Sequence, residues 1–476
     1  MRKNPEPPPF PDLNHLEDQG SGWSLPQAFS LQPSGEIVAI VGGGGKTSLM
    51  FSLAKTLPGN VVTTTTTRIF STQMKLAPAV CYAGEQGGGT GRKGVELVPL
   101  TELGSLLTVH GHCLVVGRVE GEKASGVSPT LPAQLLARPE VDIVLVEADG
   151  SRMKPCKAPA AHEPVIPTGT RLLIPVAGVD AMGQPLVEVA HRPELVSKIT
   201  GLGMEDVLTE EALATLITHP AGGKKGLPAT ARMIPLINKV ESAERLAAAR
   251  QVAGRILQDD RVDQVVVGAM NAPQPVVEVH RRVAAVVLAA GESERMGRTK
   301  LLLPWGQTTV LGQTLANLKA SAANEILVVS GHEASTVETI AAEAKVPTIH
   351  NPNYAAGEML SSLQVAVQNL PGNRAAVLVV LADQPLVKPE TIDQILISYW
   401  QGGSEIIAPA YQGQRGNPVL IGRPFFDELL GLPVGSAPRD LLKRHPAAVR
   451  LIHVPTQSIL VDLDTPAHYD RWRPKE

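Results

Sequence analysis

The sequence predicts an α/β protein built from two three-layer α/β/α domains, and three observations carry this prediction. Short β-branched runs alternate with helical patterns along both halves of the chain, as in parallel sheets covered by helices. Each half opens with an apolar run, a glycine loop and a lysine. The chain has 476 residues, which is more than one ordinary hydrophobic core organises.

In the first half, strands and helices are expected to alternate. The expected strands are apolar runs rich in valine and isoleucine, at residues 36–41, 60–64, 112–119, 142–148, 171–177, 233–238 and 263–269. Helical patterns cover residues 47–57 and 241–257.

The second half repeats this alternation. Its expected strands lie at residues 283–289, 325–330, 347–350, 375–382, 405–410, 418–421 and 449–454, with helices over 309–320 and 360–370. Residues 269–282 carry prolines and no period, so the domain boundary is placed there. A disordered tail is predicted at 1–30 and a first domain at 31–270. A linker at 271–281 and a second domain at 282–476 follow.

The composition argues against several classes of partner. The net charge of -3 gives no long-range attraction to nucleic acid or anionic lipid, and 3% aromatic residues do not support a base-stacking platform. No apolar run reaches the roughly 18 residues that span a bilayer, and the polar, proline-rich start lacks the core of a signal peptide. Cys81, Cys113 and Cys156 lie far apart in the sequence, without metal-ligand spacing. Reduced thiols and a cytoplasmic location are therefore expected, with no structural zinc site, no nucleic acid and no membrane partner.

The stretch "LAAGESERMGRTK", residues 288–300, follows an expected strand of the second half. Gly291 and Gly297 would let backbone N–H groups approach a phosphate without a Cβ in the way. Arg295 offers a planar fork for phosphate oxygens, and Lys300 a compact positive charge. The loop suits a triphosphate or a leaving pyrophosphate; a tight turn with solvated charges is the alternative.

Acidic residues strengthen the phosphate interpretation. Asp383 in "LADQPLV" follows the strand 375–382, at the edge where open α/β sheets bind ligands. Asp462 and Asp464 lie in "VDLDTPAHY" near the chain end. A carboxylate that faces a phosphate loop is a Mg²⁺ ligand candidate, whereas each aspartate alone could instead cap a helix or a turn.

These motifs resemble a known family. "LAAGESERMGRTK" fits the signature LAAGxSxRMGxxK of MobA-like nucleotidyltransferases, and the second half is similar to the molybdenum cofactor cytidylyltransferase branch. "GEMLSSL", "ADQP", "RGNPVL" and "VDLDTP" resemble motifs of that branch in the same order, over residues 281–476. Guanylyl-transferring relatives usually carry LAGG where this chain has LAAG, so the resemblance points to CTP.

The resemblance implies a role for each matching residue. Catalytic roles fall to Arg295, Lys300 and Asp383, and Mg²⁺ binding to Asp383 and Asp464. Nucleotide contacts are implied at Leu288, Ala289, Ala290, Gly291, Gly297, Ser361, Ser362 and Asn417. Many relatives have histidine at the position of Asn417. In the implied reaction, the terminal phosphate of molybdopterin attacks the α-phosphorus of CTP, which requires positioning and charge neutralisation more than a base.

A second phosphate site is predicted in the first half by "IVAIVGGGGKTSLM". This stretch is typical of a strand, a glycine nest and a helix, and its nucleotide-binding candidates are Gly42, Gly43, Gly44, Gly45, Lys46 and Thr47. The loop is shorter than GxxxxGK[ST], because Ile40 stands where the first glycine would be. Glu147 and Asp149 end another strand, as in a Walker B motif, so Thr47 and Asp149 are metal-ligand candidates. The alternative is a flexible glycine turn.

Further features of the first half have two interpretations each. Asn238 and Lys239 in "INKVE" resemble the base-reading motif NKxD with Glu241 in place of Asp, or they end a strand and cap the next helix. The threonine run 63–67 could bond phosphate or end a strand. His162 and Glu163 could touch a ligand or lie at the surface.

The motifs of the first half also resemble a family. "VGGGGKTSLM", "TTTTTRIF", "EADGSRMKPCKAPAAHEPVIP" and "INKVE" match, in order, the YqeC family of accessory proteins for selenium-dependent molybdenum hydroxylases, over residues 35–270. This resemblance implies the pathway in which the first domain works, but it does not imply a reaction. The fold implied by both resemblances is a P-loop-like N-terminal domain and a Rossmann-like C-terminal nucleotidyltransferase domain.

The implied function is a CTP:molybdopterin cytidylyltransferase fused to an NTP-binding accessory domain. It would use Mg²⁺, CTP and Mo-bound molybdopterin, with a second NTP in the first domain and a molybdenum hydroxylase apoenzyme as partner. Two alternatives remain. One is a nucleotidyltransferase for another phosphate acceptor, such as a sugar or polyol phosphate. The other is a cofactor carrier or chaperone that binds nucleotide or pterin without turnover.

Overall fold

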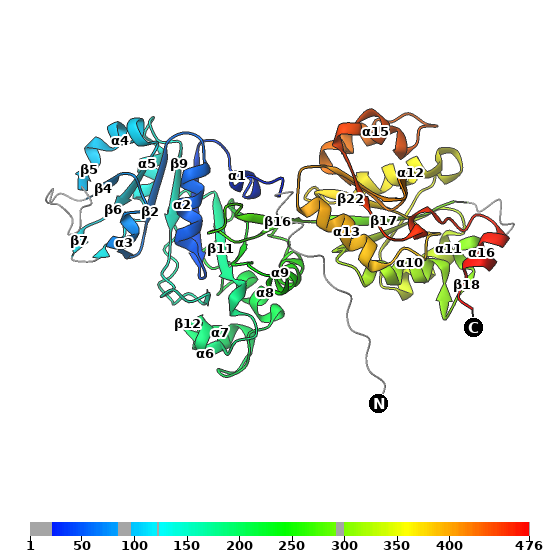
Figure 1. The fold of residues 1–476 in the computed structure, drawn as a ribbon, viewed down its shortest axis with the longest axis horizontal. Coiled ribbons are helices and arrows are strands. Elements are labelled where there is room, and N and C mark those ends of the chain that lie inside the picture. The colour runs from blue at the N-terminus through cyan, green and yellow to red at the C-terminus, as the bar shows by residue number, and fades with distance from the viewer. Residues whose placement is uncertain (1–20, 84–96, 121–122, 292–298, 476) are drawn as a thin grey trace. The chain divides into compact units, whose positions relative to one another are not determined.

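The computed structural model describes residues 21–83, 97–120, 123–291 and 299–475. The chain divides into two compact units, Met1–His280 and Arg281–Glu476, which Figure 1 colours from blue to green and from green to red. Both units are α/β with mostly parallel sheets, as predicted. No helix within the described ranges is long and apolar enough to cross a membrane.

The first unit is organised by one sheet of 11 strands. Its centre is β1 (Glu36–Gly42), which lies parallel to β11 (Leu172–Gly178) on one side and to β9 (Ile143–Glu147) on the other. Beyond β11 lie β13 (Arg232–Met233), β14 (Leu236–Asn238), β15 (Gln264–Gly268) and β16 (Val276–Arg281). Beyond β9 lie β2 (Val61–Thr65), β6 (His112–Val116), β4 (Val80–Tyr82) and β5 (Leu97–Pro99).

Helices pack on both faces of this sheet, because successive residues of β1 point to opposite sides. Val38 and Ile40 pack with α2 (Lys46–Thr56), whereas Ile37 packs with α4 (Leu103–His110) and α5 (Leu131–Leu136). The other helices are α1 (Leu25–Ala28), α3 (Ser71–Met74), α6 (Leu186–Val189), α7 (Pro193–Thr200), α8 (Glu210–Thr218) and α9 (Ala243–Ile256). Two small sheets flank the main one: β10 (Cys156–Lys157) with β12 (Ala190–His191), and β3 (Ile69–Phe70) with β8 (Lys123–Ala124) and β7 (Val119–Glu120).

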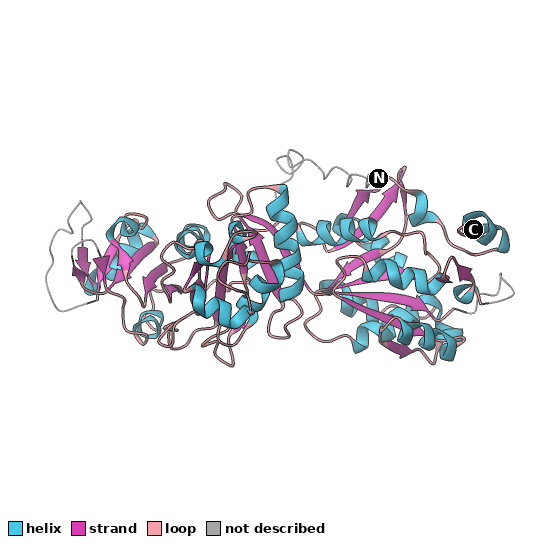
Figure 2. Cartoon of the chain, turned by 90° about the horizontal axis from the view of Figure 1, so that it is seen from below, coloured by secondary structure: helices cyan, strands magenta, loops and turns pink. Residues whose placement is uncertain are grey.

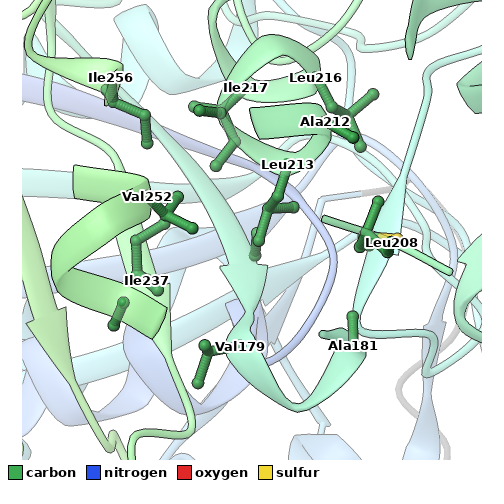
Figure 3. Close-up of a cluster of buried hydrophobic side chains, with 14 of the residues drawn as sticks. Val179, Ala181, Leu208, Ala212, Leu213, Leu216, Ile217, Ile237, Val252 and Ile256 are labelled. Atoms are coloured by element: carbon green, nitrogen blue, oxygen red, sulfur yellow. The ribbon is translucent and has the colours of Figure 1, made fainter. Parts of the chain in front are cut away.

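Part of the core is drawn in Figure 3. Leu213 and Ile217 of α8 lie in one buried cluster with Val252 and Ile256 of α9 and with Ile237 of β14. Such i, i+4 pairs form the apolar stripe that a surface helix turns toward a sheet. This cluster holds the carboxyl ends of β11 and β14, from which candidate site residues emerge.

The predicted linker 271–281 is wrong in its second part, because residues 276–281 form the edge strand β16. Val276 and Val279 are buried in the same core as α2, and Glu278 is held by Arg250 and His280. The prolines at 273 and 275 lie in the turn before this strand, and they concealed its alternating pattern. The predicted tail 1–30 lies outside the described residues up to 20, while its remainder includes the capped helix α1.

The second unit is built on an 8-stranded mixed sheet. Its centre is β17 (Val283–Ala289), parallel to β20 (Glu325–Ser330) and to β22 (Ala376–Leu381). The remaining strands are β21 (Thr348–His350), β25 (Val419–Gly422), β23 (Ile406–Tyr411), β24 (Gln414–Arg415) and β26 (Val449–His453). β25 runs antiparallel to β22 and to β23, so the expectation of a parallel sheet holds for only part of it.

Helices again cover both faces of the second sheet, and Figure 2 shows them flanking the strands. Val287 of β17 packs in the cluster with α10 (Val310–Lys319), α11 (Ala334–Glu343) and α13 (Pro389–Trp400). Val286 packs on the other side, with α12 (Tyr354–Asn369), α14 (Phe426–Leu430) and α15 (Pro438–Arg444). The chain ends with α16 (Pro466–Trp472), and the hairpin of β18 (Pro304–Trp305) and β19 (Thr308–Thr309) packs near it.

The cysteines are closer in space than their sequence positions indicate. Cys81 of β4 and Cys113 of β6 are both fully buried, and their Sγ atoms lie 3.5 Å apart on neighbouring strands. Parallel pairing of two strands separated by about thirty residues produces this contact. All three cysteines are free and buried.

Candidate functional site

The second unit has a cavity of about 360 Å³ at the carboxyl ends of its central strands. Leu288 of β17 pairs with Leu381 of β22, so the residues that follow the two strands emerge side by side. The cavity is lined by Leu288, Ala289, Ala290, Gly291, Lys300, Leu301, Tyr354, Met359, Ser362, Leu381, Ala382, Asp383, Asp462 and Asp464. The structure thus brings together predicted residues from four separate motifs, at the edge where α/β sheets bind ligands.

Lys300 is a cation that lines this cavity, and two predicted aspartates bind it. Its ammonium donates to Asp383 Oδ2 and, at 2.9 Å, to Asp464 Oδ1. Burial alone would lower the pKa of Lys300, but the charges of Asp383 and Asp464 outweigh it and raise the pKa. The lysine therefore stays charged in a cavity where 18% of its side chain reaches solvent.

Asp462 is a third carboxylate of the cavity. Gln384 Nε2 donates to its Oδ1 at 2.7 Å. Burial raises the pKa of Asp462, and the neighbouring charge of Asp383 raises it further. Among the described residues that line the cavity there are thus three carboxylates and one ammonium group, which favours a ligand that brings its own cations.

The helix-cap alternatives do not hold for Asp383 and Asp464. The helix after Asp383 is α13, whose N-cap is Lys388. The helix after Asp464 is α16, whose N-cap is Thr465, with its side chain accepting from the His468 N–H. Both aspartates instead form ion pairs with Lys300, so their side chains are part of the cavity lining.

The other predicted residues of this unit have different outcomes. Ser362 lines the cavity, and Asn351 Nδ2 donates to Ser362 Oγ at 3.0 Å and to Ser361 Oγ at 2.9 Å. Asn417 is not among the described residues that line the cavity, and its N–H donates to the Ile459 carbonyl. Arg295 and Gly297 lie outside the described residues.

Oxygen ligands for a metal are present, but they are not gathered as a finished metal centre. Within the described ranges no three acidic, histidine or cysteine side chains converge as a metal site. Asp383 and Asp464 converge instead on the Lys300 ammonium. Carboxylates are nevertheless the ligands that Mg²⁺ prefers, so the donor set fits this ion.

In the first unit, the glycine loop after β1 is packed against the chain. The N–H of Gly43 donates to the Val176 carbonyl at 2.9 Å, and the N–H of Gly44 donates to the Lys154 carbonyl at 3.0 Å. A Cβ on Gly44 would lie 2.3 Å from the Gly178 nitrogen, and Gly44 has a φ of +76°. Glycine is therefore required at this position by the crossing backbone, whether or not a phosphate binds.

Lys46 follows this loop and is buried among acidic groups. Its ammonium donates to the Gly42 carbonyl at 2.7 Å and lies 3.4 Å from Asp149 Oδ1 and 3.7 Å from Glu147 Oε1. Asp149 also accepts from the Gly42 N–H at 3.1 Å. The predicted lysine and the predicted metal ligand thus bind each other, and only 3% of the lysine side chain is exposed.

The network continues to Lys157, which the sequence interpretation did not single out. Lys157 Nζ lies 3.0 Å from Asp149 Oδ2 and 2.9 Å from Glu163 Oε2, and Arg192 donates to the same Glu163 oxygen at 2.6 Å. Burial would raise the pKa of Glu163, but the hydrogen bonds from Arg192 and Lys157 lower it to about 2. Glu163 is therefore an internal partner of the network, whereas His162 is exposed.

Thr47 and Glu147 complete the inner part of this site. Thr47 Oγ1 donates to Glu147 Oε2 at 2.9 Å and accepts from Gln73 Nε2 at 3.1 Å. Burial raises the pKa of Glu147 despite the nearby charge of Lys46. Because α2 begins at Lys46, its first N–H groups have no partner within the helix and can receive an anion.

Asn238 ties the glycine loop to the neighbouring strands. Its Nδ2 donates to the Gly44 carbonyl at 2.8 Å, and its Oδ1 accepts from the Met270 N–H at 2.9 Å. Lys239 pairs with Asp180 at 2.7 Å, and Glu241 pairs with Arg245 at 2.9 Å. The helix-cap alternative fails, since the N-cap of α9 is Ser242.

The threonine run bonds within the protein. Thr64 Oγ1 donates to the Val115 carbonyl at 2.7 Å, and Thr65 Oγ1 donates to the Glu147 carbonyl at 2.9 Å. Thr66 Oγ1 donates to the Val165 carbonyl at 2.8 Å. These hydroxyls satisfy the end of β2 rather than a phosphate.

Comparisons with known proteins follow the same division of the chain. Residues 38–194 match the family model described as YqeC protein, and residues 285–449 match the MobA-like NTP transferase domain. YqeC of Escherichia coli K12 is 32% identical over 228 residues, which are 47% of this chain and 84% of that protein. The chain is a YqeC protein fused to a MobA-like NTP transferase. The two units are the YqeC domain and the transferase domain.

The transferase domain has relatives of its own. The molybdenum cofactor cytidylyltransferase of Escherichia coli K12 is 29% identical over 185 residues, 38% of this chain and 90% of that protein. The crystal structure of Rv0371c from Mycobacterium tuberculosis H37Rv is 30% identical, with a TM-score of 0.36, and covers 40% of this chain and 97% of that one. The family models and the relatives in Escherichia coli confirm the sequence resemblances for both domains, and an NTP transferase domain implies a nucleoside triphosphate as the substrate class.

Proposed function

We propose that the transferase domain is a CTP:molybdopterin cytidylyltransferase, which makes the cytosine dinucleotide cofactor for molybdenum hydroxylases, selenium-dependent ones among them. The observation that carries the proposal is the cavity in which Lys300 lies between Asp383 and Asp464. The similar protein of Escherichia coli that is named a molybdenum cofactor cytidylyltransferase supports this choice of reaction.

The proposed step is an in-line displacement. An oxygen of the terminal phosphate of molybdopterin attacks the α-phosphorus of CTP and forms a new P–O bond. The bond from the α-phosphorus to the bridging oxygen breaks, and pyrophosphate leaves with that electron pair. The nucleophile is already an anion, so positioning and charge neutralisation replace a dedicated base.

Lys300 is the residue that we expect to neutralise the leaving pyrophosphate. Its raised pKa keeps it charged at physiological pH. Asp383 and Asp464, with Asp462 beside them, would hold Mg²⁺, which when bound neutralises charge on the triphosphate. The ammonium that now pairs with these carboxylates would then be available to the phosphates.

The choice of CTP over GTP rests on Ala290. This residue is buried, lines the cavity and stands where guanylyl-transferring relatives usually have glycine. Its methyl group reduces the space beside β17, which favours the smaller pyrimidine base.

For the YqeC domain we propose that a second nucleoside triphosphate binds at the start of α2. The free helical N–H groups and Lys46 support this, provided that Lys46 exchanges its carboxylate partners for phosphates. A molybdenum hydroxylase apoenzyme is the partner that we propose for delivery of the finished cofactor. A carrier role without turnover is the alternative for this domain.

The test of the proposed reaction uses the full chain with molybdopterin, Mg²⁺ and each NTP in turn. Pyrophosphate release and the dinucleotide product are measured together. The proposal predicts product with CTP. Product with GTP alone would refute the nucleotide assignment, and product with a sugar phosphate in place of molybdopterin would favour another acceptor.

A further inference from the structure

A second cavity of about 420 Å³ lies beside the nucleotide cavity of the transferase domain. Its walls come from the hairpin of β23 and β24, from the short helical turn Gln457–Leu460 and from α16. It is lined by Tyr411, Gln412, Gln414, Gln457, Leu460, Val461, Asp462, His468, Arg471 and Trp472. Asp462 also lines the first cavity, so the two cavities share this one carboxylate.

The chemistry of the second cavity differs from that of the first. Among the described lining residues, the first presents three carboxylates and Lys300, whereas the second presents three glutamine side chains, two aromatic rings, His468 and Arg471, with Asp462 as its one carboxylate. Amide side chains both donate and accept hydrogen bonds, so they can read a ring edge that carries N–H and C=O groups. Aromatic rings offer a flat surface on which such a ring can stack.

Arg471 provides a positive charge for an anionic group. Its guanidinium lies 5.1 Å from the centre of the Trp472 ring. Within the part of the chain that the structure describes, no carboxylate forms an ion pair with it. His468 lies three residues earlier on α16, hence on the same face, and its Nδ1 is 3.2 Å from the Asp462 carbonyl.

The walls of this cavity are held in place by the fold. Gln412 and Gly413 have φ of +48° and +81°, as required in a tight two-residue hairpin. Tyr469 of α16 is buried and donates to the Pro304 carbonyl at 2.5 Å. Trp472 packs in the same cluster as Tyr469 and Trp305. The hairpin that contains Gln412 and Gln414, and the helix α16 that contains Arg471, are therefore fixed in position by the fold.

We infer that the second cavity is the acceptor site of the transferase, and that it receives a flat heterocycle bearing a phosphate, with Arg471 on the phosphate and Gln414 on the ring edge. The inference rests on the proposed function. In-line displacement requires the acceptor to approach the α-phosphorus opposite to the leaving pyrophosphate, and the second cavity shares the lining residue Asp462 with the first. The pterin end of molybdopterin is such a heterocycle.

The test measures binding of 6-hydroxymethylpterin phosphate to the full chain by calorimetry, with Mg²⁺ and a non-hydrolysable CTP analogue present. Arg471→Ala should weaken binding of this probe about tenfold, because a charge-assisted hydrogen bond is lost. Gln414→Ala should weaken it less. Ribose 5-phosphate, which lacks the ring, should bind wild type more weakly than the pterin does. Trp472→Phe should remove the fluorescence quenching that the pterin causes.

The matched control is Arg439→Ala, which removes an exposed positive charge on α15. The control should bind the probe as wild type does, and all variants should bind CTP normally. The inference is overturned if wild type does not bind the pterin probe, if Arg471→Ala binds it as tightly as wild type, or if CTP binding weakens equally.

The inference and the proposed function can fail separately. If Arg471→Ala transfers CMP to molybdopterin with an unchanged KM for the acceptor, the inference is wrong and the proposed function stands. Pterin binding that depends on Arg471, without any transfer from CTP, would remove the function and leave the inference.

Discussion

Lys46 and Lys300 both follow a buried strand and a glycine loop, yet the structure uses them differently. Lys46 is 3% exposed and closes a network with Asp149, while Lys300 is 18% exposed and faces a cavity of about 360 Å³. Both lysines carry carboxylate partners. The same sequence pattern therefore occurs in two settings. In the first unit Lys46, Asp149, Lys157 and Glu163 form a closed network of ion pairs, and in the second unit Lys300, Asp383 and Asp464 line an open site. The backbone packed against the glycine loop of the first unit accounts for the difference.

The largest effect is expected for a substitution in the glycine loop of the YqeC domain, because this loop is packed against the backbone. Gly44→Ala places a Cβ 2.3 Å from the Gly178 nitrogen at a φ of +76°. We expect a loss of about 2–6 kcal/mol of stability, from backbone strain together with overpacking. Thermal unfolding of the full chain checks it, with Gly254→Ala in α9 as the control, since no atom lies within 4 Å of its new Cβ. Equal melting temperatures for the two variants would mean that the loop is loosely packed.

The open site is tested by Asp383→Asn. Asparagine keeps the shape but removes the charge that pairs with Lys300 and that would bind Mg²⁺. We expect the rate of CTP-dependent pyrophosphate release to fall about 10²–10³-fold, which corresponds to about 2.7–4 kcal/mol. The melting temperature should change little, because the residue caps no helix. Asp427→Asn on the exposed side of α14 is the control. A normal rate with a lowered melting temperature would remove Asp383 from the site.

The closed network has a pH signature of its own at Glu163, and this is the smallest expected effect. The pKa of Glu163 is about 2 in the folded protein, below the value of about 4.3 for an unfolded chain. Its contribution to stability is therefore complete above about pH 4.3 and is lost as the pH falls toward about 2.

Calorimetric unfolding checks this signature. The difference in melting temperature between wild type and Glu163→Gln should be larger at about pH 6 than at about pH 3. A difference that stays constant with pH would show that the carboxylate charge of Glu163 is not what Lys157 and Arg192 stabilise.

Several residues that the sequence singled out lie together in the second unit, for a physical reason. β17 and β22 are adjacent parallel strands, so motifs at their carboxyl ends must meet at one edge. Lys300 was predicted from the loop after one expected strand, Asp383 from the end of another and Asp464 from the motif near the chain end, and all three line one cavity. The supporting residues were missed, because Asn351 lies outside the quoted motifs and Gln384 acts through a hydrogen bond to Asp462, which is 78 residues away in the sequence.

The closed network was harder to predict. Lys157 lies on a two-residue strand with no periodic pattern, and only the crossing of residues 154–157 over the glycine loop brings it to Asp149. The edge strand β16 was likewise missed, because prolines precede it. Such features depend on tertiary contacts between segments that are short and polar, and local patterns carry little information about them.

The most direct test of the account compares Lys46→Ala with Lys300→Ala in the full chain. Formation of the cytosine dinucleotide from CTP and molybdopterin is measured for both variants with Mg²⁺. Lys300→Ala should lose about 10²–10³-fold in rate, whereas Lys46→Ala should keep a rate close to wild type. Equal losses in the two variants, or a normal rate in Lys300→Ala, would contradict it.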